Sequence, residues 1–261
     1  MSIEERGYLL KHQAHDAAEL LWRWQAAARN AGWKVTVIHQ AGRFPVISCQ
    51  SPAGPKTPGL YISSGIHGDE PAAPWGLLQW FETRIRALDD HNIVIVPCLN
   101  PAGLAANTRV DGDGIDLNRT FHDTAHPLVA AWRKLLDGRQ FRLAVCLHED
   151  YDAQGIYAYE LFQRGQLPLA SRLLGPVEKI IGRDLRKSID ARRATNGIIR
   201  RSRIPPKLPG YPEAIALHLS CSGHCITFET PSEFSLFLRV KAHQTFLRAV
   251  GREVFGVAGG D

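Results

Sequence analysis

The sequence predicts an α/β fold in which helices pack against a sheet of largely parallel or mixed strands. Apolar or alternating runs typical of strands occur at residues 33–39, 45–49, 60–64, 93–99, 141–147 and 225–228. Helical periodicity marks stretches between and after them, at residues 72–88, 127–136, 167–181, 213–219 and 235–255. Because strands and helices alternate along the chain, a layered α/β domain accommodates both patterns.

Two further stretches predict a long helix and a long loop. Apolar residues recur at three- and four-residue steps from residue 8 to residue 31, and Gly32 then stops the helical pattern. Residues 183–210 include Pro205-Pro206 and Pro209-Gly210, which predict an irregular loop. No repeat or linker interrupts the chain, so we expect a single domain over residues 1–261.

The composition excludes several classes of protein. The 261 residues are 44% hydrophobic, which is enough for a full core. No run of about 18 residues is predominantly apolar, so we expect neither a membrane span nor a membrane partner. Five cysteines are an odd number, which favours reduced thiols over a disulfide framework. The acidic start is unlike that of a signal peptide, so we expect a cytoplasmic protein.

The net charge of +5 is concentrated in one segment. Residues 183–207 carry nine Lys and Arg residues against Asp184 and Asp190, and contain no Phe, Tyr or Trp. Because bases would have no aromatic side chain on which to stack, the segment does not predict a nucleic-acid partner. Two interpretations stay open: a solvated surface, or an electropositive rim that attracts anionic substrates.

The first candidate site follows the strand predicted at residues 60–64. His67 and Glu70 lie just beyond it, where open α/β sheets place their ligands. An imidazole and a carboxylate three residues apart can bind one zinc ion. Such a pair also occurs in many turns by coincidence, so it does not establish a metal site on its own.

The second candidate is the loop that follows the strand predicted at residues 93–99. It contains Arg109, Asp116, Asn118 and Arg119 among several glycines and aspartates. Arginine presents a fork of donors that suits carboxylates and oxyanions. A solvated surface loop remains the alternative explanation of this composition.

Two more predicted strands end in residues that can bind metals or transfer protons. His148 directly follows residues 141–147, and Glu229 directly follows residues 225–228. At one strand end alone, either residue would be explained as a surface side chain or a helix cap. Four successive strand ends with His and Glu, then Arg, Asn and Arg, then His, then Glu indicate one functional site.

In this order the motifs resemble those of the zinc carboxypeptidase family and its wider clan, which includes the succinylglutamate desuccinylases and aspartoacylases. The resemblance covers residues 67–229. It implies an α/β domain with a mixed, mostly parallel, twisted eight-stranded sheet flanked by helices on both faces. It also implies one catalytic zinc ion per chain, bound by two histidines and a glutamate.

Residue by residue, the resemblance places His67, Glu70 and His148 on the metal. Asp116 corresponds to the residue that hydrogen-bonds the first histidine ligand and fixes its tautomer. Many relatives have Asp or Ser two residues before the third ligand, where this chain has Cys146. The support of His148 is therefore expected to differ here.

The resemblance also assigns the residues that act on the substrate. Asn118 and Arg119 correspond to the pair that binds the terminal carboxylate. Arg109 corresponds to the arginine that polarises the scissile carbonyl and stabilises the oxyanion. Glu229 corresponds to the general base, which takes a proton from water and passes it to the leaving amine.

Two features fit the family pattern less directly. In the family a mobile tyrosine closes over the substrate, and Tyr211 is our candidate for it, with Tyr157 as the rival. Cys221, His224 and Cys225 are close enough to suggest a second metal site. They offer only three ligands, and Cys225 begins an apolar strand, so we favour a structural role for them.

The loop and the strand that ends at Glu229 are closer to the peptidases than to the acylases. We therefore expect a cytoplasmic zinc metallocarboxypeptidase or amidase that cleaves a peptide or amide bond next to a free carboxylate. Bacterial murein-tripeptide amidases of this kind act on anionic cell-wall peptides, which the basic segment would suit. The alternative enzyme is an N-acyl-amino-acid amidohydrolase, for which the substrate is an acylated amino acid. An inactive zinc- or anion-binding protein is the alternative from another class.

Overall fold

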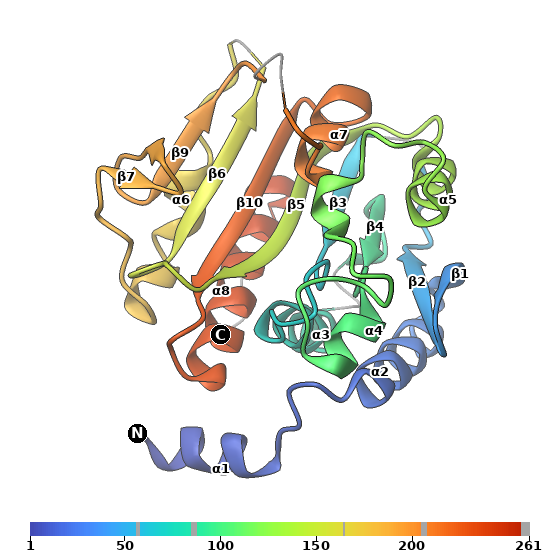
Figure 1. Ribbon diagram of the computed structural model, residues 1–261, viewed down its shortest axis with the longest axis horizontal. Helices are drawn as coiled ribbons and strands as arrows, with labels where there is room; N and C mark the ends of the chain where they lie inside the picture. Colours follow the sequence, from blue (N-terminus) through green and yellow to red (C-terminus); the bar gives the residue numbers. More distant parts are fainter. Residues whose placement is uncertain (56–57, 85–87, 164, 205–207, 257–261) are drawn as a thin grey trace.

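A sheet of eight strands in the order β1-β2-β4-β3-β5-β10-β6-β9 crosses the molecule (Figure 1). The computed structural model describes residues 1–55, 58–84, 88–163, 165–204 and 208–256. The strands of this sheet, in spatial order, are β1 (Lys34–Ala41), β2 (Phe44–Gln50), β4 (Ile93–Val96), β3 (Gly59–Ser63), β5 (Phe141–Asp150), β10 (His224–Pro231), β6 (Tyr157–Phe162) and β9 (Ile198–Arg201).

The four central strands are parallel, and the antiparallel pairings lie to either side of them. β4, β3, β5 and β10 run in one direction, whereas β1, β2 and β6 pair antiparallel with their inner neighbours. β9 pairs parallel with β6 at the far edge. The carboxyl ends of β3, β4, β5 and β10 consequently meet at one edge of the sheet, where ligands bind in folds of this type.

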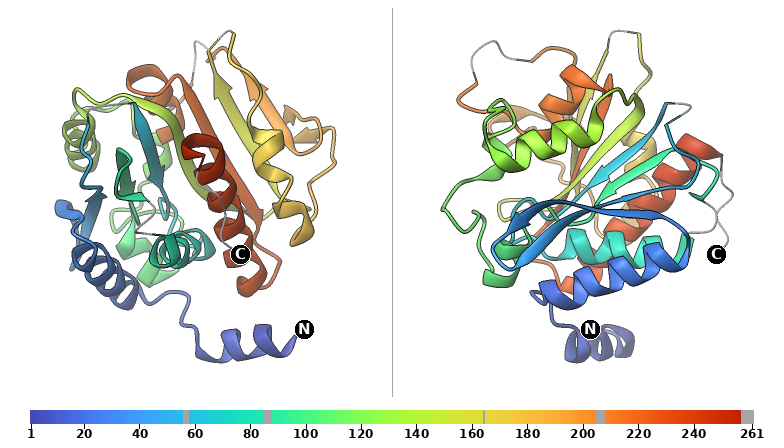
Figure 2. Two further views of the ribbon diagram at one scale, coloured as in Figure 1. Left: turned by 180° about the vertical axis from the view of Figure 1, so that it is seen from behind. Right: turned by 90° about the vertical axis from the view of Figure 1, so that its right-hand side faces the viewer.

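Helices cover both faces of the sheet. On one face lie α2 (Ala17–Asn30), α3 (Ala72–Arg84), α6 (Ala170–Leu174) and α8 (Leu236–Phe255), and α3 and α8 are seen in front of the central strands in the view from behind (Figure 2). On the other face lie α5 (Pro127–Leu136) and α7 (Glu213–Ser220). The other helices that lie wholly within the described residues are α1 (Ile3–Lys11), α4 (Pro101–Ala106) and two short 3-10 turns at Leu117–Arg119 and Val177–Lys179. The predicted α/β fold, with a mixed and mostly parallel eight-stranded sheet between helices, is confirmed.

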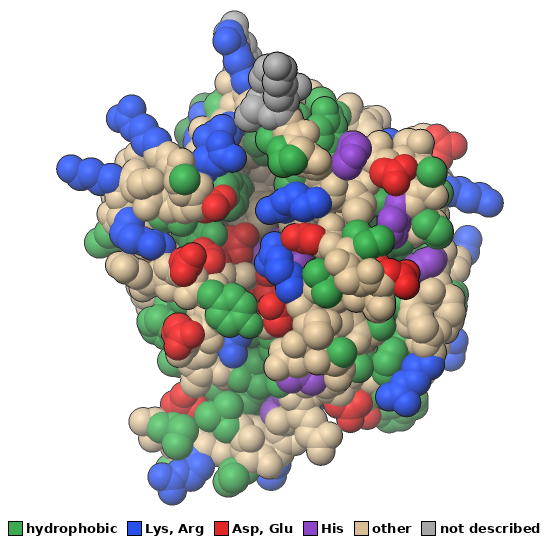
Figure 3. Space-filling model, viewed as in Figure 1, with side chains coloured by type: hydrophobic (Ala, Val, Ile, Leu, Met, Phe, Trp, Pro, Cys, Tyr) green, Lys and Arg blue, Asp and Glu red, His purple; other side chains and the backbone are tan. Residues whose placement is uncertain are grey.

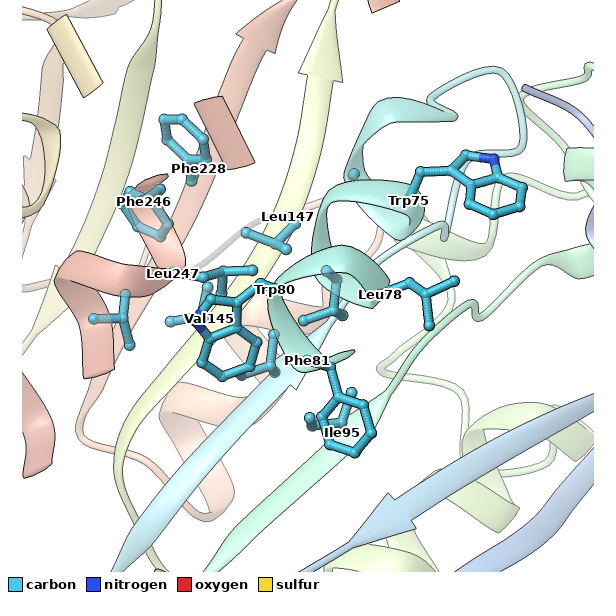
Figure 4. Packing of buried hydrophobic residues seen from close by; sticks show 14 of the residues in the cluster. Trp75, Leu78, Trp80, Phe81, Ile95, Val145, Leu147, Phe228, Phe246 and Leu247 are labelled. Carbon is cyan, nitrogen blue, oxygen red and sulfur yellow. The ribbon is translucent and has the colours of Figure 1, made fainter. Parts of the chain in front are cut away.

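Each face of the sheet has its own hydrophobic core, because alternate residues of a strand point to opposite faces. In β3, Leu60 and Ile62 join the cluster beneath α3 and α8, whereas Tyr61 joins the cluster beneath α5 and α7. Aromatic and aliphatic side chains fill the larger cluster (Figure 4), among them Trp75, Leu78, Trp80, Phe81, Val145, Leu147, Phe228, Phe246 and Leu247.

Two of the expected helices are divided. The pattern over residues 8–31 forms α1 and α2 separately, because Asp16 caps α2 by accepting the Glu19 N–H at 2.9 Å. The pattern over residues 167–181 forms only α6 and a 3-10 turn, because Pro176 interrupts the helix after Gly175.

The prediction of an irregular loop over residues 183–210 was wrong for part of the segment. This segment contains the hairpin of β7 (Ser188–Ile189) and β8 (Arg192–Arg193) and the edge strand β9. These strands are two to four residues long and rich in arginine, so no apolar alternation marked them in the sequence. Residues 205–207 of the segment, including Lys207 of the basic cluster, lie outside the described residues.

Two features of the whole chain agree with the composition. All five cysteines are buried and free. Among the described residues, no helix has both the length and the apolar character needed to cross a membrane.

Candidate metal centre and substrate cavity

Three side chains that can bind a metal meet at the carboxyl end of the central strands. His67 and Glu70 lie in the loop between β3 and α3, and His148 lies near the end of β5. All three are buried, and one potential ligand atom from each lies within 4.8 Å of the others. Among the described residues, these three are the His, Cys, Asp or Glu side chains that lie close enough together to hold one metal ion.

The loop reaches this position because its backbone packs tightly against α4. A Cβ atom on Gly68 would lie 1.9 Å from the carbonyl carbon of Gly103, so a side chain there would push the loop away. The Gly68 N–H also donates to the Thr108 carbonyl at 2.9 Å. Gly68, which lies between the two predicted ligands, therefore helps to fix the position of the loop against α4.

The ring nitrogens of the two histidines converge on the carboxylate of Glu70. His67 Nδ1 lies 2.5 Å from Glu70 Oε1, and His148 Nδ1 lies 3.0 Å from Glu70 Oε2. The second nitrogen of His67, Nε2, lies 3.2 Å from Asp116 Oδ1, so it donates to that carboxylate when Nδ1 binds a metal. The donor set and its tautomers thus fit a divalent cation held by two histidines and one carboxylate.

The electrostatics of this cluster favour a positive charge. Burial by itself lowers the pKa of His67, but the neighbouring Glu70 and Asp116 raise it to about 9. Burial by itself raises the pKa of Glu70, but His67 and His148 hold it well below its usual range. The buried carboxylate therefore favours a positive charge between the two histidines. A metal ion would supply that charge in place of the protons on the histidines.

A cavity of about 510 Å³ opens onto this cluster. His67, Glu70 and His148 form part of its lining, together with Arg109 and Glu229. On the surface, acidic and basic side chains gather around the hollow near the middle of the face in Figure 3. These five residues come from the loop after β3, the loop after α4 and the ends of β5 and β10.

The loop after α4 forms one wall of the cavity. Arg109 Nε donates to Asp116 Oδ2 at 3.2 Å, and Arg109 Nη1 lies 3.8 Å from Glu70 Oε1. Asn118 and Arg119 also line the cavity, and Arg119 Nη1 donates to the Asn118 carbonyl at 2.9 Å. The Asn118 side-chain oxygen accepts the Glu213 N–H at 3.0 Å, so the amide nitrogen is the donor that remains for a ligand.

Glu229 lies beside the metal cluster on β10. It pairs in register with His148 of β5 and with Tyr157 of β6. Burial raises the pKa of Glu229 to about 8, and the negative charges of Glu70 and Asp150 contribute to the rise. A carboxyl group with a pKa close to neutral can both take up and release a proton there, which is the property required of a general acid or base.

The two tyrosines considered for the substrate side occupy different places. Tyr211 does not line the cavity; its N–H donates to His122 Nδ1 at 3.3 Å, and its ring lies near the His122 ring. Tyr157 lines the cavity, and its hydroxyl donates to Asp150 Oδ2 at 2.9 Å. Tyr159, which the sequence analysis did not single out, lines it too.

The residues Cys221, His224 and Cys225 have other partners. His224 Nε2 lies 2.8 Å from Glu160 Oε1, and the Cys225 thiol donates to the Ser222 carbonyl at 3.4 Å. In the part of the chain that is described, these residues form no cluster with metal-binding spacing. The structural role that we favoured for them agrees with these contacts.

The basic segment divides into paired and cavity-lining arginines. Arg183, Arg186 and Arg200 form ion pairs with Glu178, Asp184 and Glu160. Arg192, Arg201 and Arg203 line the cavity instead. Part of the segment is therefore folded surface, and part of it lines the cavity.

Solved structures of known proteins share this fold. A candidate metallopeptidase from Shewanella amazonensis SB2B superposes with a TM-score of 0.84 at 23% identity, over 94% of this chain and 96% of that one. A metallo-carboxypeptidase from Burkholderia cenocepacia superposes with a TM-score of 0.62 at 17% identity, over 90% of this chain and 68% of that one. At these identities the likeness concerns the fold.

The sequence comparisons cover the segment that carries the metal cluster. Residues 56–153 match the family model of the succinylglutamate desuccinylase/aspartoacylase catalytic domain, and His67, Glu70, Asp116 and His148 all lie within them. This part of the chain is therefore similar to catalytic domains of the succinylglutamate desuccinylase/aspartoacylase family. Over 77 residues the chain is also 36% identical to murein peptide amidase A of Escherichia coli (strain K12), a match that spans 30% of this chain and 31% of that relative. One of these two sequence matches is to deacylating enzymes and the other is to an amidase.

Proposed function

We propose that this protein is a metal-dependent hydrolase that cleaves a peptide or amide bond next to a free carboxylate. The observation that carries the proposal is the single cavity that joins the His67, Glu70 and His148 cluster to Glu229 and to the arginine-bearing loop. A cation-binding cluster, a group able to move a proton and donors for an anion are the parts that such a reaction requires.

The proposed cation is zinc, held by His67, Glu70 and His148. Two histidines and one carboxylate are a ligand set that zinc uses in hydrolases. When bound, zinc supplies an electrophile that polarises a carbonyl group and acidifies a water molecule. Asp116 holds the His67 ring in the tautomer that directs Nδ1 to the cation.

The remaining residues have separate tasks in the proposed reaction. Glu229 accepts a proton from the attacking water and returns it to the leaving nitrogen, so the bond to nitrogen breaks as the new carboxylate forms. Arg109 stabilises the negative charge that develops on the carbonyl oxygen. Asn118 and Arg119 bind the free carboxylate of the substrate through the amide nitrogen and the guanidinium group.

We propose small anionic peptides as the substrate class. Arg192, Arg201 and Arg203 line the part of the cavity contributed by β8, β9 and the residues after it, and they suit a substrate with further carboxylates. The murein peptide amidase among the relatives supports a peptide of the cell-wall type. We propose Tyr157 rather than Tyr211 as the tyrosine that contacts substrate, because Tyr157 lines the cavity.

An N-acyl-amino-acid amidohydrolase is the second candidate, supported by the desuccinylase/aspartoacylase family model. The two candidates differ in the size of the substrate. Turnover of γ-linked and α-linked di- and tripeptides should exceed turnover of succinylated and acetylated amino acids if the first candidate is correct. A clear preference for single acylated amino acids would favour the second. A protein that only binds zinc or anions would hydrolyse neither set.

Glu229→Gln tests the proposed chemistry. The substitution keeps the shape of the side chain but removes its ability to take up a proton, so turnover should fall by about 10²–10⁴-fold. Zinc content should stay unchanged, since Glu229 is not a proposed ligand. Glu233→Gln, four residues along the chain and exposed, is the matched control and should retain wild-type turnover. Turnover of Glu229→Gln within a few-fold of wild type would remove this residue from the proposed role.

A further inference from the structure

Glu213 is a buried carboxylate that the proposed chemistry does not use. It is the first residue of α7 and is only 1% exposed. Burial raises its pKa, which its hydrogen bonds with Ser63 and Tyr61 partly offset. Within the described residues no Lys, Arg or His forms an ion pair with it, so hydrogen bonds are the main compensation for its burial, with a smaller contribution from the charge of His148.

Its carboxylate is nevertheless fully surrounded by donors. Tyr61 donates its hydroxyl to Oε1 at 2.5 Å, and Trp132 donates its indole N–H to the same oxygen at 3.1 Å. Ser63 donates its hydroxyl to Oε2 at 2.6 Å. The Cys146 thiol is also hydrogen-bonded to Glu213. Removing one partner from such a network by mutation destabilises the protein, because a buried donor or acceptor is then left without a hydrogen bond.

Two of these donors stand just before the proposed histidine ligands. Ser63 is the last residue of β3 and precedes His67 by four residues. Cys146 precedes His148 by two residues on β5, and side chains two apart on a strand point to the same face. β3 and β5 pair side by side with Ser63 opposite Cys146. One carboxylate therefore joins the two strand ends from which the ligands extend.

The backbone of Glu213 makes a further connection to the substrate side. Its N–H donates to the Asn118 side-chain oxygen at 3.0 Å. Asn118 in turn donates its own N–H to Asp116 Oδ1 at 3.0 Å, and the same oxygen faces His67 Nε2. The first residue of α7 thus contacts the amide proposed to bind substrate directly, and it is linked to His67 through Asn118 and Asp116.

We propose that Glu213 is a positioning residue of the metal centre, whose carboxylate fixes the ends of β3 and β5 at the separation that lets His67 and His148 bind one cation. This inference rests on the proposed function, since it assumes that the cluster binds a metal.

Glu160 is a matched control in the same chain. It is also 1% exposed, and it also accepts three hydrogen bonds, from the Leu169 N–H, Arg200 and His224. None of these partners lines the cavity. A substitution of Glu160 should therefore reproduce the loss of a buried carboxylate network without affecting the metal ligands.

The test is the zinc affinity of the folded full-length protein, measured by competition with a chromophoric chelator. Glu213→Gln leaves one acceptor oxygen where there were two and should weaken zinc binding by about 10–100-fold. Ser63→Ala removes only the link from Glu213 to β3 and should also weaken zinc binding. Its circular dichroism spectrum should match that of wild type, which shows that the fold is retained. Glu160→Gln should lower the melting temperature and leave zinc affinity within two-fold of wild type, by the same reasoning.

The outcomes separate this inference from the proposed function. If wild type binds zinc and both Glu213→Gln and Ser63→Ala bind it equally well, Glu213 does not position the site, and the proposed function stands. If Glu160→Gln loses as much affinity as Glu213→Gln, the effect is one of general stability and the inference is wrong. If wild type binds no zinc, the proposed function fails and the inference fails with it. Should Glu213→Gln not fold, Ser63→Ala carries the test alone.

Discussion

The pKa values of two buried carboxylates of the site are shifted in opposite directions, because their neighbours differ. Two histidines hold the pKa of Glu70 well below its usual range, whereas burial raises the pKa of Glu229 to about 8. The first carboxylate is therefore charged and suited to hold a cation, and the second exchanges a proton near neutral pH. Different environments give one type of side chain two proposed tasks.

Arg109 offers the sharpest test of a single side chain. Its side chain is 44% exposed and lies against Glu70 and Asp116, so its removal should leave the fold intact. Arg109→Ala should lower turnover by about 10²–10³-fold, because one donor to the developing oxyanion is lost. Arg43→Ala, which removes an arginine stacked on Phe44, is the control. Steady-state kinetics measures the turnover of both variants. Equal turnover of Arg109→Ala and Arg43→Ala would exclude Arg109 from this role.

The proposed ligands could be predicted from the sequence because each stands at a strand end. His67, His148 and Glu229 follow apolar runs, and the chain order of these ends carries the family resemblance. Glu213 could not be predicted in this way. It is a glutamate at the start of a helix, and only its tertiary contacts with Tyr61, Ser63 and Trp132 distinguish it from a surface side chain.

At the scale of elements, the β7–β8 hairpin forms one side of the cavity entrance. Its turn residues Asp190 and Ala191 have φ values of 47° and 52°, which is unusual for residues other than glycine. Tyr159 of β6 donates its hydroxyl to Asp190 Oδ2 at 2.7 Å and so ties the turn to the main sheet. Arg192 lines the cavity directly after this turn, while Arg193 does not.

The hairpin allows the proposed anionic specificity to be tested with adjacent residues. Arg192→Glu should raise the KM for a peptide with several carboxylates by about 3–10-fold, because like charges then face each other across the cavity. Arg193→Glu changes the net charge equally outside the cavity and should leave KM nearly unchanged. Equal KM values for both variants at low ionic strength would mean that the rim does not bind substrate.

Elements with strong periodicity were the ones that the sequence predicted well. The helix expected at residues 127–136 has the same bounds as α5. The helix expected at residues 235–255 was predicted to start one residue before α8 does. The strands β6, β7, β8 and β9 escaped prediction, since they depend on pairing with neighbours rather than on their own pattern.

At the scale of the whole molecule, the site depends on a core that packs α3 and α8 together behind it. His243 of α8 is fully buried at this contact, where a Cβ atom on Gly76 of α3 would lie 2.5 Å from its own Cβ. Its Nε2 lies 3.2 Å from Thr230 Oγ1, next to Glu229 in sequence. Burial lowers the pKa of His243 to about 3.

This buried histidine predicts loss of stability in mild acid. The unfolded chain takes up the proton near pH 6.5, whereas the folded protein resists it until about pH 3, so acid favours unfolding between these values. The contribution to the free energy of unfolding should fall by about 2 kcal/mol from about pH 7 to about pH 5. Urea unfolding of wild type and His243→Gln at both pH values measures it. The variant should lose less stability on acidification, and an identical loss in both proteins would contradict the assignment.

The central claim is that His67, Glu70 and His148 bind one metal ion, and elemental analysis of purified protein tests it most directly. Wild type, His67→Ala and His148→Ala should be compared after dialysis against zinc. We predict about one zinc per chain in wild type and none retained by either variant. No bound metal in wild type, with no hydrolytic activity gained on adding zinc, would contradict the account.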